Sequence, residues 1–136
     1  MPDTIILGAG LAGLTAARQL QAHGQTVAIV DKGRGVGGRL ATRRIGQARL
    51  DHGAQFFTTR SDDFKAVVAE AVAGGAVKEW CRGFGEPDGY PRYCGTSGMT
   101  DFAKWLARDL DISLGVEIDK IAVSYTHLTL PTTPYV

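Results

Sequence analysis

The feature that most constrains the fold lies at the start of the chain. Thr4–Leu7 forms a continuous apolar run, which is typical of a strand buried on both faces of a parallel sheet. The letters GAGLAG follow at positions 8–13, and Leu11–His23 is then rich in good helix formers, with Gly24 in the position of a C-cap glycine. Val27–Val30 is a second apolar run. This order of strand, glycine turn, helix and strand predicts a β-α-β unit within an α/β fold.

Three glycines in the turn have the spacing of a Rossmann-like dinucleotide-binding motif. Gly8 allows the tight turn, Gly10 lets a pyrophosphate approach the backbone, and Gly13 lets the helix pack closely on the strand. The free N–H groups and the partial positive charge at the start of the helix favour phosphate. We therefore predict that the pyrophosphate lies over Gly10 and Leu11, with Ala12 keeping this part of the helix small.

Asp31 ends the second strand, 18 residues after Gly13. An acidic residue at about this spacing accepts hydrogen bonds from a ribose hydroxyl of the dinucleotide. The same carboxylate repels a 2′-phosphate, which disfavours NADP in this pocket. FAD and NAD both remain compatible with these residues, and a plain glycine turn without a ligand is the alternative interpretation.

A second glycine-rich stretch, DKGRGVGGRLATRR at positions 31–44, carries five lysines and arginines. Gly37 and Gly38 would let the chain pass close to a cofactor. Arg39 would place its guanidinium near the pyrophosphate or, in a flavin cofactor, the ribityl chain. Lys32 is a further predicted cofactor contact. The alternative is an exposed basic loop or a weak nucleic-acid patch, although no aromatic residue interleaves the arginines.

Three segments, in order along the chain, resemble one group of flavoproteins. GVGGRLAT, at 35–42, resembles the G-G-R-x-x-T element of the flavin-dependent amine oxidase superfamily. LDHGAQFFT, at Leu50–Thr58, and RYCGTSGMTDFAKWLA, at Arg92–Ala107, resemble the renalases and their bacterial relatives. The resemblance runs from Ile5 to about Val116. It implies that the cofactor is FAD, bound without a covalent link.

In that family the DHGAQ segment lies near the isoalloxazine ring. The resemblance therefore implies that His52, Gly53, Ala54 and Gln55 lie beside the flavin, with Gln55 or backbone groups contacting its polar edge. From the residues alone, Asp51 and His52 would equally form hydrogen bonds within a turn.

Renalases oxidise unusual dihydro isomers of NAD(P)H to NAD(P)⁺ and pass the electrons to oxygen, which becomes hydrogen peroxide. The resemblance thus predicts an enzyme with a small-molecule substrate, in which the flavin carries the chemistry and no catalytic residue or metal site is assigned. Arg92 and Tyr93 are candidates for the substrate side. Two alternatives stay open: another amine oxidase or desaturase relative, and a non-catalytic dinucleotide-binding module.

The chain is predicted to hold part of a two-domain flavoprotein. Residues 1–60 would form the N-terminal half of the FAD-binding domain, and residues 61–122 would begin a mixed α+β substrate domain. Proteins of the resembled family are about twice this length, so we expect a truncated N-terminal fragment that is itself inactive. The elements expected after the basic loop are short strands around Gly46 and Gly53, a helix at Ser61–Ala73 capped by Ser61, a strand at Val77–Arg82, an apolar helical stripe from Met99 to Leu110, and strands at Ile112–Leu114 and Val116–Val123.

The last fourteen residues, 123–136, show no likeness to that family. Back-translated as GTC TCT TAT ACA CAT CTG ACG CTG CCG ACG, Val123–Thr132 spells the transposon-end adapter used in sequencing libraries. We therefore expect this tail to be non-native, with no functional role for His127 and poor packing of Pro131–Val136.

Composition limits the partners and the compartment. The chain has 44% hydrophobic and 21% charged residues, as in an average globular protein, and its net charge of +1 argues against bulk binding to nucleic acid or to an anionic membrane. Two cysteines without a basic signal-peptide region predict free thiols and a cytoplasmic location. The N-terminal apolar run is too short and too rich in glycine for a transmembrane span. The oligomeric state is left open.

Overall fold

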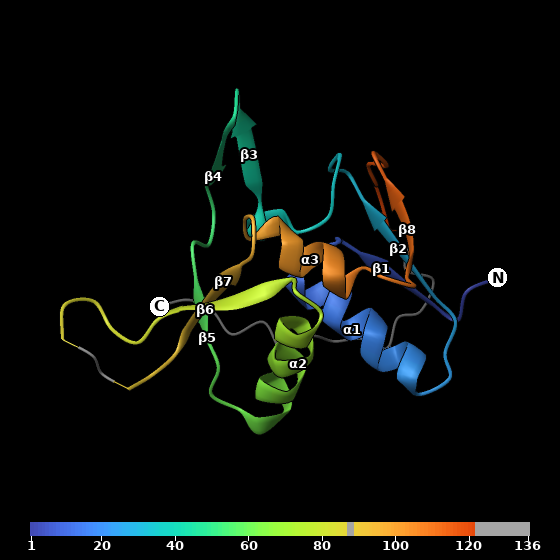
Figure 1. Ribbon diagram of the computed structural model, residues 1–136. Coiled ribbons are helices and arrows are strands. Elements are labelled where there is room, and N and C mark those ends of the chain that lie inside the picture. The colour runs from blue at the N-terminus through green and yellow to red at the C-terminus, as the bar shows by residue number, and fades with distance from the viewer. Residues whose placement is uncertain (87–88, 122–136) are drawn as a thin grey trace, which may run out of the picture.

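The computed structural model describes residues 1–86 and 89–121. These residues form a parallel sheet, an antiparallel sheet and a hairpin that projects from the body of the molecule (Figure 1). Helix α3, Thr100–Leu106, lies between the two sheets and contacts both helix α1, Leu11–Ala22, and the antiparallel sheet. Within the described ranges, no helix is both long and apolar enough to span a membrane.

The parallel sheet confirms the predicted α/β fold class and its β-α-β unit. Its strand order is β1-β2-β8, and α1 connects the first two strands. Ile6, Ile29 and Ile112 align across the three strands and share one face of the sheet. The strands are β1 at Thr4–Leu7, β2 at Val27–Asp31 and β8 at Asp111–Leu114.

Only one face of β1 is covered by the described residues. Ile6 packs against the core that α1 supplies, whereas Ile5 and Leu7 point the other way and keep 60% and 48% of their surface exposed. The prediction that Thr4–Leu7 is buried on both faces is therefore wrong for the described part of the chain. The reason is geometric, because alternate side chains of a strand point to opposite faces and α1 lies on one of them.

Helix α1 ends at Ala22, two residues before the predicted glycine. Gly24 adopts a φ of +81°, and its N–H bonds the Gln21 carbonyl at 2.9 Å. The next N–H, of Gln25, bonds the Leu20 carbonyl at 3.0 Å. This pair of bonds is a Schellman motif, whose left-handed residue is most easily a glycine.

The antiparallel sheet has the order β5-β7-β6 and carries helix α2 on its core side. Ser61 caps α2 as predicted, since its hydroxyl accepts the Phe64 N–H at 3.3 Å. The remaining elements are the 3₁₀ turn η1 at Gly38–Leu40, hairpin strands β3 at Thr42–Ile45 and β4 at Ala48–Asp51, β5 at Phe57–Thr58, α2 at Asp62–Ala73, β6 at Val77–Cys81 and β7 at Arg92–Gly95.

Helix α3 supplies the centre of the core. Phe102 is 1% exposed and stacks on Phe57 of β5, with ring centroids 5.0 Å apart, and on Trp105 at 6.3 Å. On the α1 side, the Arg18 guanidinium lies 5.1 Å from the centre of the Trp105 ring. The apolar stripe predicted from Met99 to Leu110 therefore joins the two sheets through one short helix.

Some predicted elements differ from the structure. The strand predicted around Gly46 is present as the β3–β4 hairpin, but no strand forms at Gly53, and β7 was not predicted. Residues 116–121, the described part of the predicted Val116–Val123 strand, form no strand, because Gly115 adopts a left-handed φ of +71° and interrupts the extended run. The predictions for the tail at 123–136 lie outside the described residues.

The predicted domain boundary after residue 60 stays a prediction. Two strand pairings cross it: β8 pairs with β2, and β5 pairs with β7. If a second domain begins at residue 61, one of its strands, β8, thus belongs to the parallel sheet formed by β1 and β2.

Candidate dinucleotide-binding site

The two glycine-rich segments lie side by side. Gly10 and Gly37 form an isolated parallel bridge, and the Gly37 N–H donates to the Ala9 carbonyl at 2.8 Å. Gly37 and Gly38 take φ values of +118° and +53°, which the glycine residue tolerates without strain. The turn after β1 and the basic loop after β2 therefore make one continuous backbone surface.

Each glycine of the first turn has a different structural role. Gly8 has a φ of +109°, and a Cβ added at Gly13 would lie 2.0 Å from the Gly8 carbonyl oxygen. A Cβ at Gly10 would meet nothing within 4 Å, so this glycine keeps open the surface of the turn. This open position fits a ligand that approaches the backbone, as predicted for the pyrophosphate.

The start of α1 suits an anion. Gly10 is the N-cap, and no side chain of the described residues caps the helix or places an acidic group in its first turn. Leu11 and Ala12 are both exposed at this end. The first N–H groups of a helix have no intrahelical partner, and together with the helix dipole they attract phosphate.

Asp31 has two backbone partners in the structure. Its Oδ2 accepts the Ala9 N–H at 2.5 Å, and its Oδ1 accepts the Gly33 N–H at 2.6 Å. The carboxylate thus holds the glycine turn against the basic loop. Each carboxylate oxygen can accept a second hydrogen bond, so the predicted contact with a ribose hydroxyl remains compatible with this geometry. Lys32, the next residue, is exposed.

The third predicted segment adjoins the second. The Arg39 carbonyl accepts the Ala54 N–H at 2.8 Å, and a Cβ added at Gly53 would lie 2.0 Å from that same oxygen. The close approach of these two segments therefore requires a glycine at position 53. The side chains of Arg39, His52 and Gln55 are exposed on this surface.

A set of hydroxyl and carboxylate contacts, which the sequence did not reveal, fixes the hairpin to α3. Asp51 Oδ1 accepts the Thr42 hydroxyl at 2.5 Å and the Met99 N–H at 3.0 Å. The Thr100 hydroxyl donates to the Leu40 carbonyl at 3.0 Å. Asp51 thus links segments far apart in the chain, and the prediction that it bonds within a turn is wrong.

A groove of about 480 Å³ begins next to Gln55 and runs across the outer face of the antiparallel sheet. Lys78, Trp80 and Cys94 lie along it. Trp80 keeps 51% of its surface exposed.

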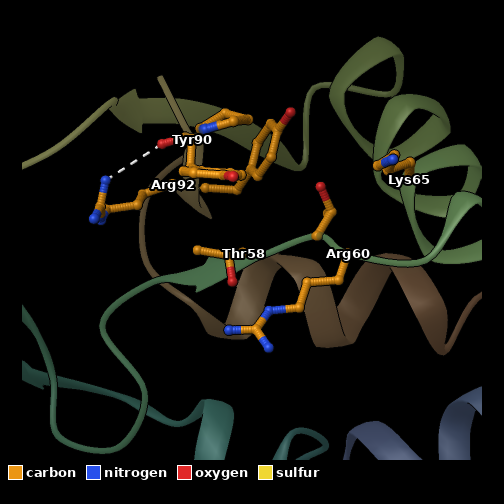
Figure 2. A pocket seen from close by; sticks show the side chains of 8 residues that line it. Thr58, Arg60, Lys65, Tyr90 and Arg92 are labelled. Atoms are coloured by element: carbon orange, nitrogen blue, oxygen red, sulfur yellow. Dashed lines mark hydrogen bonds between the residues drawn. The ribbon is translucent and has the colours of Figure 1, made fainter. Parts of the chain in front are cut away.

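A larger cavity of about 840 Å³ lies at the other end of that sheet, beside the start of α2 (Figure 2). Arg92 and Tyr93, the two candidates for the substrate side, both line it. Figure 2 shows Arg92 directed toward the Tyr90 carbonyl, to which it donates at 3.3 Å, and away from Lys65. The cations of this cavity therefore do not converge on one point.

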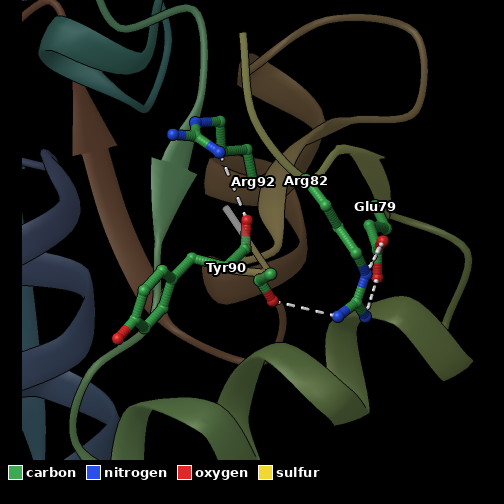
Figure 3. A network of polar contacts seen from close by, with 5 residues as sticks. Glu79, Arg82, Tyr90 and Arg92 are labelled. Atoms are coloured by element: carbon green, nitrogen blue, oxygen red, sulfur yellow. Dashed lines mark hydrogen bonds and ion pairs between the residues drawn. The ribbon is translucent and has the colours of Figure 1, made fainter. Parts of the chain in front are cut away.

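The loop above this cavity is held by an ion pair (Figure 3). Arg82 donates to both carboxylate oxygens of Glu79, at 2.7 and 2.9 Å, and to the Gly89 carbonyl at 3.2 Å. The hydrogen bonds that Arg82 donates to Glu79, and then the charge of Glu79, raise the pKa of Arg82. All these groups are well exposed, so the pair positions the loop more than it stabilises the fold.

Known proteins are similar to this chain over its first half. Residues 6–71 match the family described as an NAD(P)-binding Rossmann-like domain. Putrescine oxidase of Kocuria rosea is 40% identical over 68 residues, which are 50% of this chain and 14% of that protein. The 1-hydroxycarotenoid 3,4-desaturase of a Flavobacterium is 40% identical over 58 residues, 43% of this chain and 12% of the desaturase.

Two further proteins are similar to this chain. A Mycobacterium tuberculosis protein named as a flavin-containing monoamine oxidase is 37% identical over 68 residues, 50% of this chain and 15% of that protein. A structure of putrescine oxidase bound to putrescine is 32% identical, with a TM-score of 0.47, and the match covers 60% of this chain and 17% of that chain. The chain thus spans a small part of the length of the curated relatives that it matches.

The family match confirms the predicted fold class, and the flavin-containing relative agrees with FAD as the cofactor. The individual site residues and the cytoplasmic location stay predictions. The matched range, 6–71, contains all three segments that the structure brings together.

Proposed function

We propose, from the premise that the dinucleotide-binding part of this chain belongs to the FAD-dependent amine oxidase superfamily, that the chain comes from a renalase-like oxidoreductase. Its substrate would be an isomeric dihydronicotinamide dinucleotide, and oxygen would be the electron acceptor. The observation that carries the proposal is the continuous surface made by positions 8–13, 37–39 and 52–55. The LDHGAQFFT segment, which resembles the renalases, is part of that surface.

Different residues of this surface would hold different parts of FAD. The backbone at Gly10 and Leu11 would take the pyrophosphate, and the Asp31 carboxylate would accept a ribose hydroxyl. Arg39 is exposed beside Gly38 and would contact the pyrophosphate or the ribityl chain. Gln55 would lie at the polar edge of the flavin. When bound, the flavin would accept a hydride from the substrate and pass the two electrons to oxygen.

A second candidate is an amine oxidase or desaturase, and the names of the relatives favour it. Putrescine oxidase acts on an amine by its name, and the carotenoid enzyme is named as a desaturase. The shared 6–71 segment holds the cofactor-binding motif, which all these reactions need equally. The substrate therefore depends on residues outside that segment.

The decisive experiment is a substrate test on the full-length flavoprotein recovered from source DNA. Hydrogen peroxide release is measured with the 2- and 6-dihydro isomers of NADH, with putrescine and with a carotenoid. The renalase-like proposal expects turnover of the dihydronicotinamides alone. Turnover of putrescine without turnover of either isomer would establish the second candidate instead.

The cofactor is tested separately. The flavin released by heat denaturation is identified by chromatography, and Asp31→Ala is expected to weaken its binding by about 1–3 kcal/mol because hydrogen bonds to a charged group are lost. Copurification of NADP without flavin would contradict the FAD assignment.

A further inference from the structure

The outer face of the antiparallel sheet has an aromatic platform beside Gln55. Trp80 contacts Phe56 and Phe84, with ring centroids 5.8 and 5.6 Å apart. Phe56 and Phe84 also meet edge to face at 5.4 Å, so each of the three rings touches the other two. This packing restrains the indole while 51% of the Trp80 surface stays exposed. A restrained and exposed aromatic ring is suited to stack on a planar ligand.

Positive charge lies along the same groove. Lys78 and Trp80 of β6 both line this groove, although the strand pairing shifts register between Glu79 and Cys81. Arg49, from β4 of the hairpin, also lines the groove. Lys78 aligns with Cys94 of β7, which also lines the groove and whose thiol has its pKa raised by burial.

Asp51, the one acidic residue among the described residues that line the groove, is already engaged. Asp51 Oδ1 accepts hydrogen bonds from the Thr42 hydroxyl and the Met99 N–H, which hold the hairpin on α3. The two cations of the groove therefore outnumber its single carboxylate. A cationic diamine would meet net repulsion here, whereas a phosphate would be attracted.

We propose that this groove, with Trp80 as a stacking platform and Lys78 and Arg49 as phosphate contacts, is the subsite for the nicotinamide mononucleotide half of the substrate. The inference rests on the proposed function, because that function places the flavin beside Gln55. A planar ring on Trp80 would lie at the Gln55 end of the groove, and its 5′-phosphate would reach the lysine or the arginine. The volume of about 480 Å³ is in the range of small-molecule sites.

Binding is tested on the full 136-residue chain with nicotinamide mononucleotide as the probe. The chain has two tryptophans, and Trp105 is 8% exposed, so quenching by the probe reports on Trp80. We expect saturable quenching that an excess of putrescine does not reverse. The Trp80→Phe variant should lose the quenching. Equal quenching in that variant, or displacement by putrescine, would overturn the proposal.

The phosphate contact is tested by Lys78→Gln, with Lys104→Gln as the matched control. Both lysines are exposed, but Lys104 is on α3 and outside the groove. Loss of one charge-assisted hydrogen bond should raise the dissociation constant about tenfold in the first variant and leave it unchanged in the second. Lys78→Arg should restore most of the affinity. Equal affinities in both glutamine variants would contradict the assignment of Lys78.

A second measurement does not depend on tryptophan. Cys94 lines the groove and Cys81 does not, so alkylation by iodoacetamide, read by peptide mass spectrometry, has an internal control. The probe should slow modification of Cys94 several-fold and leave Cys81 unaffected. Equal modification of Cys94 with and without saturating probe would place the ligand elsewhere.

The two proposals fail in different ways. If the full-length enzyme oxidises dihydronicotinamides and Lys78→Gln leaves both KM and kcat unchanged, the groove assignment is wrong and the function stands. If the enzyme oxidises only amines while the probe still binds with Lys78-dependent affinity, the function is wrong and the groove remains a mononucleotide site. The combined proposal expects a higher KM in Lys78→Gln with kcat retained.

Discussion

At the scale of single residues, two glycines of one turn differ in the space around them. A Cβ at Gly10 meets nothing within 4 Å and its φ of −81° suits alanine, whereas a Cβ at Gly13 would lie 2.0 Å from the Gly8 carbonyl oxygen. We predict that Gly10→Ala keeps the melting temperature of the full-length protein within a few degrees but loses most bound flavin. Gly13→Ala should lower the melting temperature itself. The same flavin content in wild type and Gly10→Ala would show that the open position is not used by the cofactor.

Arg39 allows a second prediction at this scale. Its side chain is exposed next to the glycine bridge, where a planar guanidinium can bind two oxygens of a pyrophosphate at once. Arg39→Lys should therefore weaken flavin binding about tenfold, because lysine has the charge but lacks the fork. Arg34→Lys, an exposed change in the same loop, is the control, and flavin affinity is measured by fluorescence titration of the apoprotein. Equal affinities in the two variants would place Arg39 in a solvated loop.

At the scale of elements, Asp3 and Thr26 hold together the starts of β1 and β2. Asp3 Oδ2 accepts the Thr26 hydroxyl at 2.6 Å and the Thr26 N–H at 2.8 Å. The hydroxyl, and then the N–H, lower the pKa of Asp3 below its ordinary value of 3.8. A carboxylate with a lowered pKa stabilises the fold above its unfolded-state pKa, and this contribution is lost as the pH falls through the folded-state pKa.

The consequence is a stability difference that depends on pH. The gap in urea midpoint between wild type and Asp3→Asn should be present at pH 6 and shrink as the pH falls below about 4. Urea denaturation of the 136-residue chain, followed by circular dichroism at several pH values, measures this gap. A gap that stays constant down to pH 2.5 would mean that the ionised carboxylate is not what joins the strands.

At the scale of the whole molecule, the two sheets depend on one short helix. Phe102 of α3 is 1% exposed and contacts rings from β5, α2 and α3 itself. Phe102→Ala should cost about 3–5 kcal/mol of unfolding free energy, since it leaves a cavity where the sheets meet. Phe84→Ala is the matched control, because Phe84 is 60% exposed and its loss should cost much less. Equal costs, measured by urea denaturation, would mean that α3 does not join the sheets.

Local patterns predicted most of the individual elements. The strand at Thr4–Leu7, the helix that ends just before Gly24 and the helix capped by Ser61 are all as expected. Each depends on residues close in sequence, such as a cap, a left-handed glycine or a run of one periodicity. The strand β7 was missed because its four residues, RYCG, are too short for a period and follow a loop rich in glycine and proline.

The amino-acid sequence by itself determined the β-α-β unit and the spacing of its glycines and Asp31, because backbone conformation and helix ends depend on near neighbours. The tertiary structure alone decided that β8 returns to β2, that Gly53 presses against the Arg39 carbonyl, and that Asp51 joins the hairpin to α3. It also decided that Trp80 is exposed on an open sheet face. These contacts join residues separated by 14 to 83 positions along the chain. No local pattern specifies such a pairing, because what selects it is the packing of whole elements around α3.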